Sequence, residues 1–246
     1  MPIAGGHARL EVSIAEKRYL GADGQPVEVL RDLRFAVEPG EVVALLGRSG
    51  CGKTTALRIV LGLDRDFRGA VEARADRVAA VFQEPRLLPW RTVEQNVRLA
   101  LPDGEMEKPL EGLFSSLGLA DKRASYPGEL SMGLARRAAL ARAFALEPDL
   151  LVMDEPFVSL DAQTALDMRR LLARLLEERP TTVLMVTHNA EEAIELADRL
   201  LFLSPRPAHV VGEIPVARAR SERCGEFRRR LREEIGERFP SVLARA

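Results

Sequence analysis

An eight-residue stretch reads Gly47-Arg48-Ser49-Gly50-Cys51-Gly52-Lys53-Thr54 and fits the pattern G-x-x-x-x-G-K-[ST] of a phosphate-binding loop. Its glycines allow successive backbone N–H groups to turn toward one point, which makes a concave site for an anion. Lys53 supplies a positive charge for the β- and γ-phosphates, and the Thr54 hydroxyl is a ligand for magnesium. The stretch therefore predicts a site for a nucleoside triphosphate with Mg²⁺.

The flanking segments supply the strand and the helix that such a loop requires. Residues 41–46 read Glu-Val-Val-Ala-Leu-Leu, a short apolar run rich in strand formers, and residues 55–63 open a helix that ends at Gly62. A glycine-rich turn that matches the pattern by chance is the alternative. Thr55, at the start of the helix, is included in the expected nucleotide site.

The composition is that of an ordinary globular protein. The chain has 246 residues, is 46% hydrophobic and 30% charged, and carries a formal net charge of -1, which gives no global electrostatic case for nucleic acid. Its two cysteines, Cys51 and Cys224, predict no disulfide framework and favour a reducing cytosol. Residues 1–6 lack the apolar core of a secretory signal, and no apolar run reaches membrane-spanning length.

The order of elements along the chain predicts an α/β fold. Strand-like segments precede the phosphate loop, helical periodicity punctuated by prolines follows, and strand and helix patterns then return. We expect a single domain over residues 1–246. Its parts are a nucleotide-binding core lobe in residues 1–82 and 146–217, a helical lobe in residues 83–145 and a C-terminal helical tail in residues 218–246.

The tail carries an apolar stripe on a short helix. Phe227, Leu231, Ile235 and Phe239 recur at four-residue steps with arginines between them. Packing of this stripe on the core is the expected role, and a basic helix on a membrane surface is the alternative.

Two carboxylates end a second apolar strand. Residues 150–155 read Leu-Leu-Val-Met-Asp-Glu, and in a nucleotide-binding sheet such a strand end lies beside the phosphate loop. Asp154 is therefore expected to hold the magnesium ion, and Glu155 to orient or polarise the attacking water. A strand that runs into an acidic turn without function is the alternative.

A second anion site is predicted where Ser131 precedes a helix. Ser131 is a typical N-cap, and Gly133 leaves the backbone N–H groups accessible. This short pattern is weak evidence by itself, because Ser-x-Gly is common at helix starts.

Together these motifs resemble those of the ATP-binding cassette (ABC) ATPases over nearly the whole chain. Residues 47–54 match the Walker A loop, and the other matches follow in family order: Gln83 the Q-loop, residues 130–134 the signature, Asp154-Glu155 the Walker B end, residues 159–161 the D-loop and Thr187-His188 the H-loop. The resemblance implies a P-loop NTPase core with a parallel sheet, an antiparallel β subdomain and a helical insert.

The resemblance also implies a mechanism in two copies. Two subunits would stack head to tail as a homodimer with two ATP molecules in the seam, each ATP lying on one phosphate loop and covered by Ser131 and Gly133 of the other copy. The implied roles are catalysis for Glu155, His188, Gln83 and Lys53, metal coordination for Thr54, Gln83 and Asp154, communication across the seam for Asp161, and stacking on adenine for Tyr19. Plain surface packing is the alternative for Tyr19.

The chain departs from the family pattern at three positions. Met132 and Leu134 replace a glycine and a glutamine of the usual Leu-Ser-Gly-Gly-Gln signature, and Asn189 stands where Asp often follows the histidine. Since Ser131 and Gly133 remain, we expect activity with altered packing at the seam.

Several segments look like the nitrate/sulfonate/taurine importer ATPases: residues 83–90, 153–157, 160–164 and 204–207. The implied protein is a peripheral ATPase on the cytoplasmic face of the inner membrane. It would power import of a small anionic or sulfonate-type solute with two permease subunits and an extracytoplasmic solute-binding protein. Leu87, Leu88 and Trp90 are candidate permease contacts, with the apolar core of the insert as the alternative.

Other functions remain open at this point. An importer ATPase for another small solute, such as a pyrimidine precursor, has the same motifs. A non-transport ABC ATPase would add a coiled-coil insertion or a second cassette, and a small kinase or GTPase would lack the signature.

Overall fold

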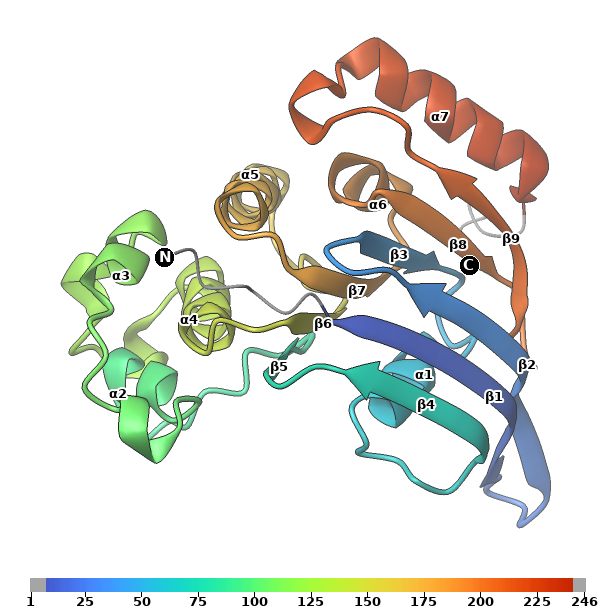
Figure 1. Cartoon of the computed structure of the whole chain (residues 1–246), viewed down its shortest axis with the longest axis horizontal. Helices are drawn as coiled ribbons and strands as arrows, with labels where there is room; N and C mark the ends of the chain where they lie inside the picture. The colour runs from blue at the N-terminus through green and yellow to red at the C-terminus, as the bar shows by residue number, and fades with distance from the viewer. Residues whose placement is uncertain (1–7, 241–246) are drawn as a thin grey trace.

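A computed structural model describes residues 8–240, which form two β-sheets with helices around the larger sheet (Figure 1). The N-terminal segment of residues 1–6 and the outer ends of the expected core lobe and tail, residues 1–7 and 241–246, lie outside this range. Within residues 8–240, none of the helices combines the length and the apolar character needed to cross a membrane.

The larger sheet has six strands in the order β5-β6-β7-β3-β8-β9. Neighbouring strands from β5 to β8 are parallel, whereas the edge strand β9 runs antiparallel to β8. The expected parallel core is confirmed, with this antiparallel edge as an addition. The strands are β3 (Val42–Leu46), β5 (Val78–Val81), β6 (Leu150–Asp154), β7 (Thr182–Thr187), β8 (Arg199–Leu203) and β9 (Val210–Pro215).

The smaller sheet is antiparallel and has the order β2-β1-β4. It consists of β1 (Arg9–Leu20), β2 (Pro26–Val37) and β4 (Arg68–Arg74). Residues of β1 alternate between exposed and buried from Arg9 to Ala15, as a sheet covered on one face requires. This sheet is the expected antiparallel β subdomain.

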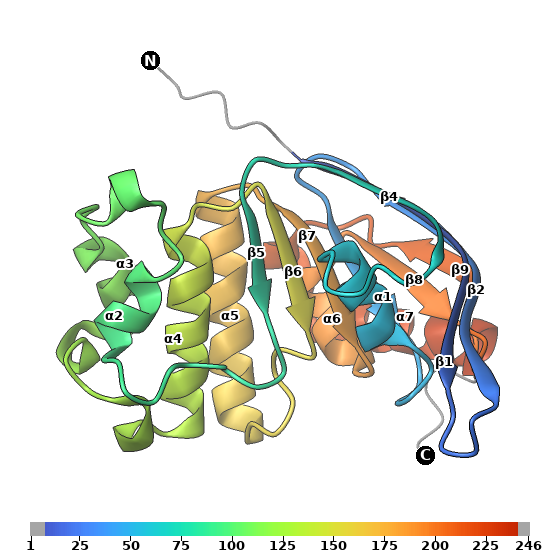
Figure 2. The same ribbon diagram turned by 90° about the horizontal axis from the view of Figure 1, so that it is seen from below.

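Seven α-helices complete the described fold between residues 8 and 240. They are α1 (Lys53–Val60), α2 (Val93–Arg98), α3 (Glu111–Ser116), α4 (Met132–Ala145), α5 (Ala162–Glu178), α6 (Ala190–Leu196) and α7 (Gly225–Arg238). In Figures 1 and 2, α2, α3 and α4 lie together at one end of the molecule, away from the smaller sheet. The longest of these helices is α5, with 17 residues.

The apolar run of β3 is continuous because both faces of the larger sheet are covered. Val42, Ala44 and Leu46 pack with helical residues in one core cluster, whereas Val43 and Leu45 pack with α1 and the smaller sheet in the other. All five residues are buried. The strand that leads into the phosphate loop is therefore fixed from both sides.

The apolar stripe of α7 packs on the core, as expected for the part of the tail that is described. Leu231 and Ile235 are buried, and the Phe239 ring stacks on Phe202 of β8 with centroids 4.0 Å apart. A Cβ at Gly212 of β9 would lie 2.5 Å from Phe239, so the absence of a side chain at Gly212 makes room for this ring.

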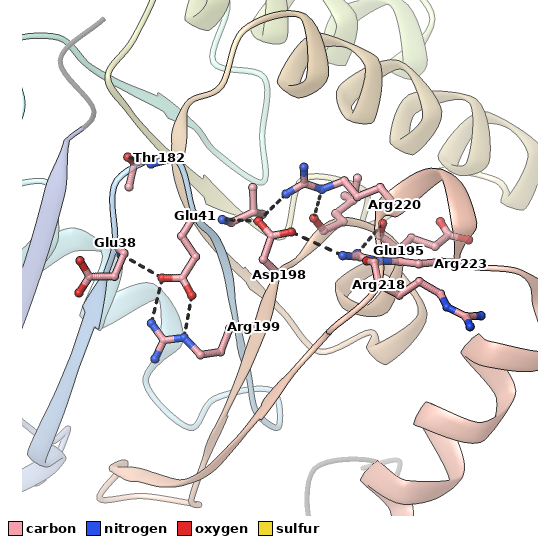
Figure 3. Close-up of polar contacts among 12 residues, drawn as sticks. Glu38, Glu41, Thr182, Glu195, Asp198, Arg199, Arg218, Arg220 and Arg223 are labelled. Carbon is pink, nitrogen blue, oxygen red and sulfur yellow. Dashed lines mark hydrogen bonds and ion pairs between the residues drawn. The ribbon is translucent and has the colours of Figure 1, made fainter.

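Two arginines between β9 and α7 hold the C-terminal end of α6 (Figure 3). Arg223 donates to the carbonyls of Ile194 and Glu195 at 2.9 and 3.0 Å, and Arg220 donates to Leu196 at 2.7 Å. These carbonyls end a helix and have no partner within it, so guanidinium groups satisfy them and also meet the negative end of the helix dipole. The C-terminal segment is thereby attached to α6.

Arg223→Ala is expected to lower the free energy of unfolding by about 2 kcal/mol, because its charged hydrogen bonds to buried carbonyls are lost. Urea denaturation measures the effect, and proteolysis should cut the C-terminal segment faster. Arg229→Ala, at an exposed position on α7, is the control and should change stability by less than about 0.5 kcal/mol. Equal stability of the two variants would contradict this account of the tail.

Candidate functional site

The glycine loop turns between β3 and α1 with backbone angles that need glycine. Gly50 has φ +77° and Gly52 has φ +128°, both in the region that side chains disfavour. Gly47 is also confined, since a Cβ there would lie 2.8 Å from the Cys51 sulfur. Burial raises the pKa of the Cys51 thiol, so this thiol is held in its neutral form inside the loop.

Lys53 folds back across this loop. Its ammonium group donates to the carbonyls of Gly47 at 2.8 Å and Arg48 at 3.0 Å and lies 3.6 Å from a Glu155 oxygen. The side chain is only 4% exposed. A buried ammonium needs acceptors, so the loop carbonyls and Glu155 hold this charge.

Thr54 and Asp154 form the second contact between loop and sheet. The Thr54 hydroxyl donates to an Asp154 oxygen at 3.2 Å. Burial raises the pKa of Asp154, and the neighbouring Glu155 charge raises it further. A cation beside these oxygens would favour the charged carboxylate, and hard oxygen donors of this kind suit Mg²⁺.

Glu155 lies between Lys53 and His188. His188 Nδ1 is 3.1 Å from the second Glu155 oxygen. The contact follows from strand register, because β6 and β3 flank β7 in parallel and all three end at the same edge. Glu155 has φ +43°, a strained conformation that often marks functional sites.

The segment around His188 is backed by a buried carboxylate on α6. Thr187 donates to Glu192 at 2.7 Å, and the Asn189 side chain donates to the other oxygen of the same carboxylate at 3.2 Å. Glu192 is 7% exposed, and burial raises its pKa. Glu192 therefore holds the residues on both sides of His188.

Two expected site residues, Gln83 and Tyr19, are not linked by side-chain hydrogen bonds to Lys53, Glu155 or His188 within residues 8–240. Gln83 is exposed two residues beyond β5, and within residues 8–240 no side-chain hydrogen bond joins it to the carboxylates. Tyr19, on β1, donates its hydroxyl to Asp64 at 2.6 Å, and the ammonium of the buried Lys17 lies 4.4 Å from its ring centroid. Asp64 follows α1 closely, so Tyr19 is held near that helix, and the residue is 40% exposed.

The signature residues and Asp161 share a separate surface groove. Ser131 caps α4 by accepting from Leu134 N at 3.3 Å, and Asp161 caps α5 by accepting from Thr164 N at 3.0 Å. Gly133 lies so close to α5 that a Cβ would be 2.8 Å from the Thr164 methyl. Residues from both motifs line the groove, and none of them belongs to the glycine loop.

Two buried-face arginines of α4 were not singled out from the sequence. Arg136 is 4% exposed and donates to the carbonyls of Pro156 at 2.9 Å and Val158. Arg142 donates to the carbonyls of Arg86 at 2.7 Å and Pro85 at 2.9 Å. The sequence offered one signal for Arg136: it lies four residues before the buried Leu140, so the two share a face of the helix.

The remaining predicted nucleotide residues lie around the mouth of the loop. Arg48, Ser49 and Gly50 are exposed, and so is Thr54, whereas Thr55 is half-buried in the first turn of α1. The structure therefore brings together Lys53, Thr54, Asp154, Glu155 and His188 around an open loop.

Glu192→Ala is expected to lower the free energy of unfolding by about 1–3 kcal/mol, because the buried Thr187 hydroxyl loses its acceptor. The imidazole resonances of His188 in NMR spectra should also show greater mobility. Glu191→Ala is the control, since Glu191 makes only a surface pair with Arg232 that is worth about 1 kcal/mol or less. Unchanged His188 resonances would contradict the positioning role.

Comparisons with known proteins show which family the chain resembles. The family model described as ABC transporter matches residues 30–158. The chain is 46% identical to the aliphatic sulfonates import ATP-binding protein SsuB 2 of Pseudomonas syringae pv. tomato, over 84% of this chain and 87% of the relative. It is also 46% identical to SsuB 1 of Streptomyces avermitilis, over 85% and 81% respectively.

Solved structures share the fold. The ATP-binding cassette MJ0796, determined as a dimer in a post-hydrolysis state with ADP and phosphate, superposes with a TM-score of 0.71 and 26% identity over 85% of this chain and 99% of that one. The cbiO1 protein of Clostridium perfringens superposes with a TM-score of 0.72 over 95% of this chain and 96% of that one. Because the identity is 22%, this likeness supports the fold alone. The two-sheet fold, the glycine loop and these similarities lead to one conclusion: the chain belongs to the ABC transporter family.

Proposed function

We propose that this chain is the ATP-hydrolysing subunit of an importer for small anionic solutes of the aliphatic sulfonate class. The observation that carries the proposal is the position of Glu155, between Lys53 and His188 and beside the Thr54–Asp154 pair. The names of the relatives, which are aliphatic sulfonate import ATP-binding proteins, support the cargo class.

The phosphates of ATP bind in the glycine loop. Lys53 exchanges the carbonyls of Gly47 and Arg48 for phosphate oxygens, which carry more negative charge and make stronger acceptors. The first turn of α1 adds N–H groups from Thr54 and Thr55. Tyr19, held by Asp64 near α1, offers its ring to the adenine.

Thr54 and Asp154 would hold the magnesium ion, with Gln83 as a further ligand. Within residues 8–240 there is no cluster of three His, Cys, Asp or Glu side chains that could bind a metal alone. The ion would be bound by Thr54, Asp154 and Gln83 together with the phosphates of ATP, as is usual for Mg²⁺. When bound, the ion neutralises charge that develops on the phosphates.

Glu155 orients the attacking water, and His188 contacts the γ-phosphate. The carboxylate is already directed between Lys53 and His188 by its strained backbone, so little reorganisation is needed when ATP enters. Glu192 keeps His188 in place from behind.

A second copy of the chain closes each site. Ser131, Gly133 and Asp161 line a groove that is separate from the glycine loop of the same chain, and Met132 in this groove is 53% exposed. The N-terminus of α4 attracts the γ-phosphate held by the partner copy. Hydrolysis removes this attraction, so ATP favours the closed homodimer and ADP lets it open.

The helical lobe, residues 83–145, docks on two permease subunits at the cytoplasmic face of the inner membrane. Large apolar side chains are exposed there, with Trp90 at 69%, Tyr126 at 47% and Leu99 at 45%. Leu87 packs toward the core, so Trp90 is the better candidate contact. An extracytoplasmic binding protein delivers the solute to the permease.

Glu155→Gln is expected to retain ATP binding and to lower the rate of ATP hydrolysis by about 10²- to 10⁴-fold, because the amide cannot act as a base toward water. With ATP present the variant should accumulate as a closed dimer, which size-exclusion chromatography detects. Glu72→Gln, an exposed carboxylate on β4, is the control. Hydrolysis at the wild-type rate in Glu155→Gln would remove Glu155 from its assigned role.

Cells that lack this chain are expected to lose uptake of a labelled short alkanesulfonate, because permeation depends on ATP hydrolysis. Wild-type chain should restore uptake and Glu155→Gln should not. Uptake of nitrate and of a pyrimidine precursor is measured in parallel. Loss of one of these in place of alkanesulfonate uptake would reject the sulfonate class and leave the ATPase assignment standing.

A further inference from the structure

A groove of about 760 Å³ opens between α5, α6 and the C-terminal segment. Figure 1 shows these three helical segments on the same side of the larger sheet, with α6 between α5 and α7. Six arginines line the groove against three glutamates, which leaves an excess of three positive charges in the lining. The arginines are Arg169, Arg170, Arg174, Arg220, Arg223 and Arg228.

Four of these arginines share two carboxylates. Glu195 on α6 accepts from Arg169 on α5 and from Arg228 on α7. Asp198, just beyond α6, pairs with Arg220 at 2.6 Å and with Arg223 at 3.5 Å (Figure 3). Each carboxylate neutralises only one of its two guanidinium partners, so both clusters keep a positive charge while their geometry is fixed.

The other two arginines lie one helical turn apart on α5. Arg170 and Arg174 make no ion pair or side-chain hydrogen bond with any part of the chain in residues 8–240, and both are exposed. The lining of the groove also includes the apolar residues Leu166, Ala173 and Leu196. Cationic and apolar side chains together make the groove amphipathic.

We infer that this groove is a binding site for a small organic anion with a tetrahedral oxyanion head and a short apolar stem. Guanidinium groups bind oxyanions through paired N–H donors, and the apolar side chains of the lining accommodate the stem. The volume is within the range of natural ligand pockets. Binding here does not depend on which solute is transported.

The helices that line the groove also carry two loops of the ATP site. α5 begins directly after Asp161, and α6 begins directly after Asn189, the neighbour of His188. An anion that joins α5 to the C-terminal segment across α6 stabilises one arrangement of these helices. The ligand therefore changes the rate of ATP hydrolysis from outside the ATP site.

Isothermal titration calorimetry with butane-1-sulfonate tests the site, in the Lys53→Ala background so that the phosphate loop does not compete. We expect saturable binding that is weakened at least about tenfold by Arg170→Glu with Arg174→Glu. The control pair, Arg91→Glu with Arg229→Glu, makes the same charge change at exposed positions outside the groove and should leave binding intact. Both pairs alter exposed side chains, so folding is preserved.

The outcomes are distinct. Absence of binding, or equal binding in both double variants, would overturn the site. Sulfate that binds as tightly as butane-1-sulfonate, or butanol that does so, would overturn the amphipathic ligand.

The coupling to hydrolysis is tested in the chain with Lys53 intact. Butane-1-sulfonate should change its ATP hydrolysis rate about fivefold, and this effect should be lost in the Arg170→Glu, Arg174→Glu variant. An unchanged rate would overturn the coupling. If the unmutated chain does not hydrolyse ATP even without any anion, that result would count against the proposed ATPase function.

Discussion

The parallel register of β3, β6 and β7 is the constraint on which the site depends. Leu46 pairs with Thr187 and Asp154 pairs with Val186, so the next residues of all three strands emerge at one edge. Lys53, Glu155 and His188 are far apart in the sequence and meet only because of this register. A strand that slipped by one residue would turn its side chains to the opposite face and separate the two carboxylates from the loop.

Two residues that follow β6 at this edge have a strained backbone, and hydrogen bonds from neighbouring segments hold them in place. Glu155 and Ser159 have φ +43° and +62°, and such conformations cost on the order of 1–3 kcal/mol each. The Glu155 N–H donates to Val186 O at 3.0 Å, and Arg136 binds carbonyls between the two strained residues. These contacts hold the strained connection between β6 and α5, from which the Glu155 carboxylate is directed between Lys53 and His188.

The sequence was informative where one local pattern decides the structure. The apolar run of residues 41–46 and the motif around Glu155 predict buried strands and their polar ends, and the structure confirms the fold. β4, in contrast, has mostly exposed residues and no alternation, because its position depends on pairing with β1. Arg136 reads as a surface arginine until tertiary packing buries it, and the placement of Tyr19 depends on a hydrogen bond across 45 positions of the sequence. Such contacts between distant segments leave no periodic signal.

Helix α4 is attached to the segments that follow strands β5 and β6. Arg142 holds the backbone that follows Gln83, and Arg136 holds the backbone that follows Glu155. A rotation of α4 must therefore displace both segments together. A force applied to α4 would therefore reach the backbone beside Gln83 and the backbone beside Glu155 through two guanidinium groups of the same polypeptide, so a mechanical signal can pass to the Glu155 carboxylate within one chain.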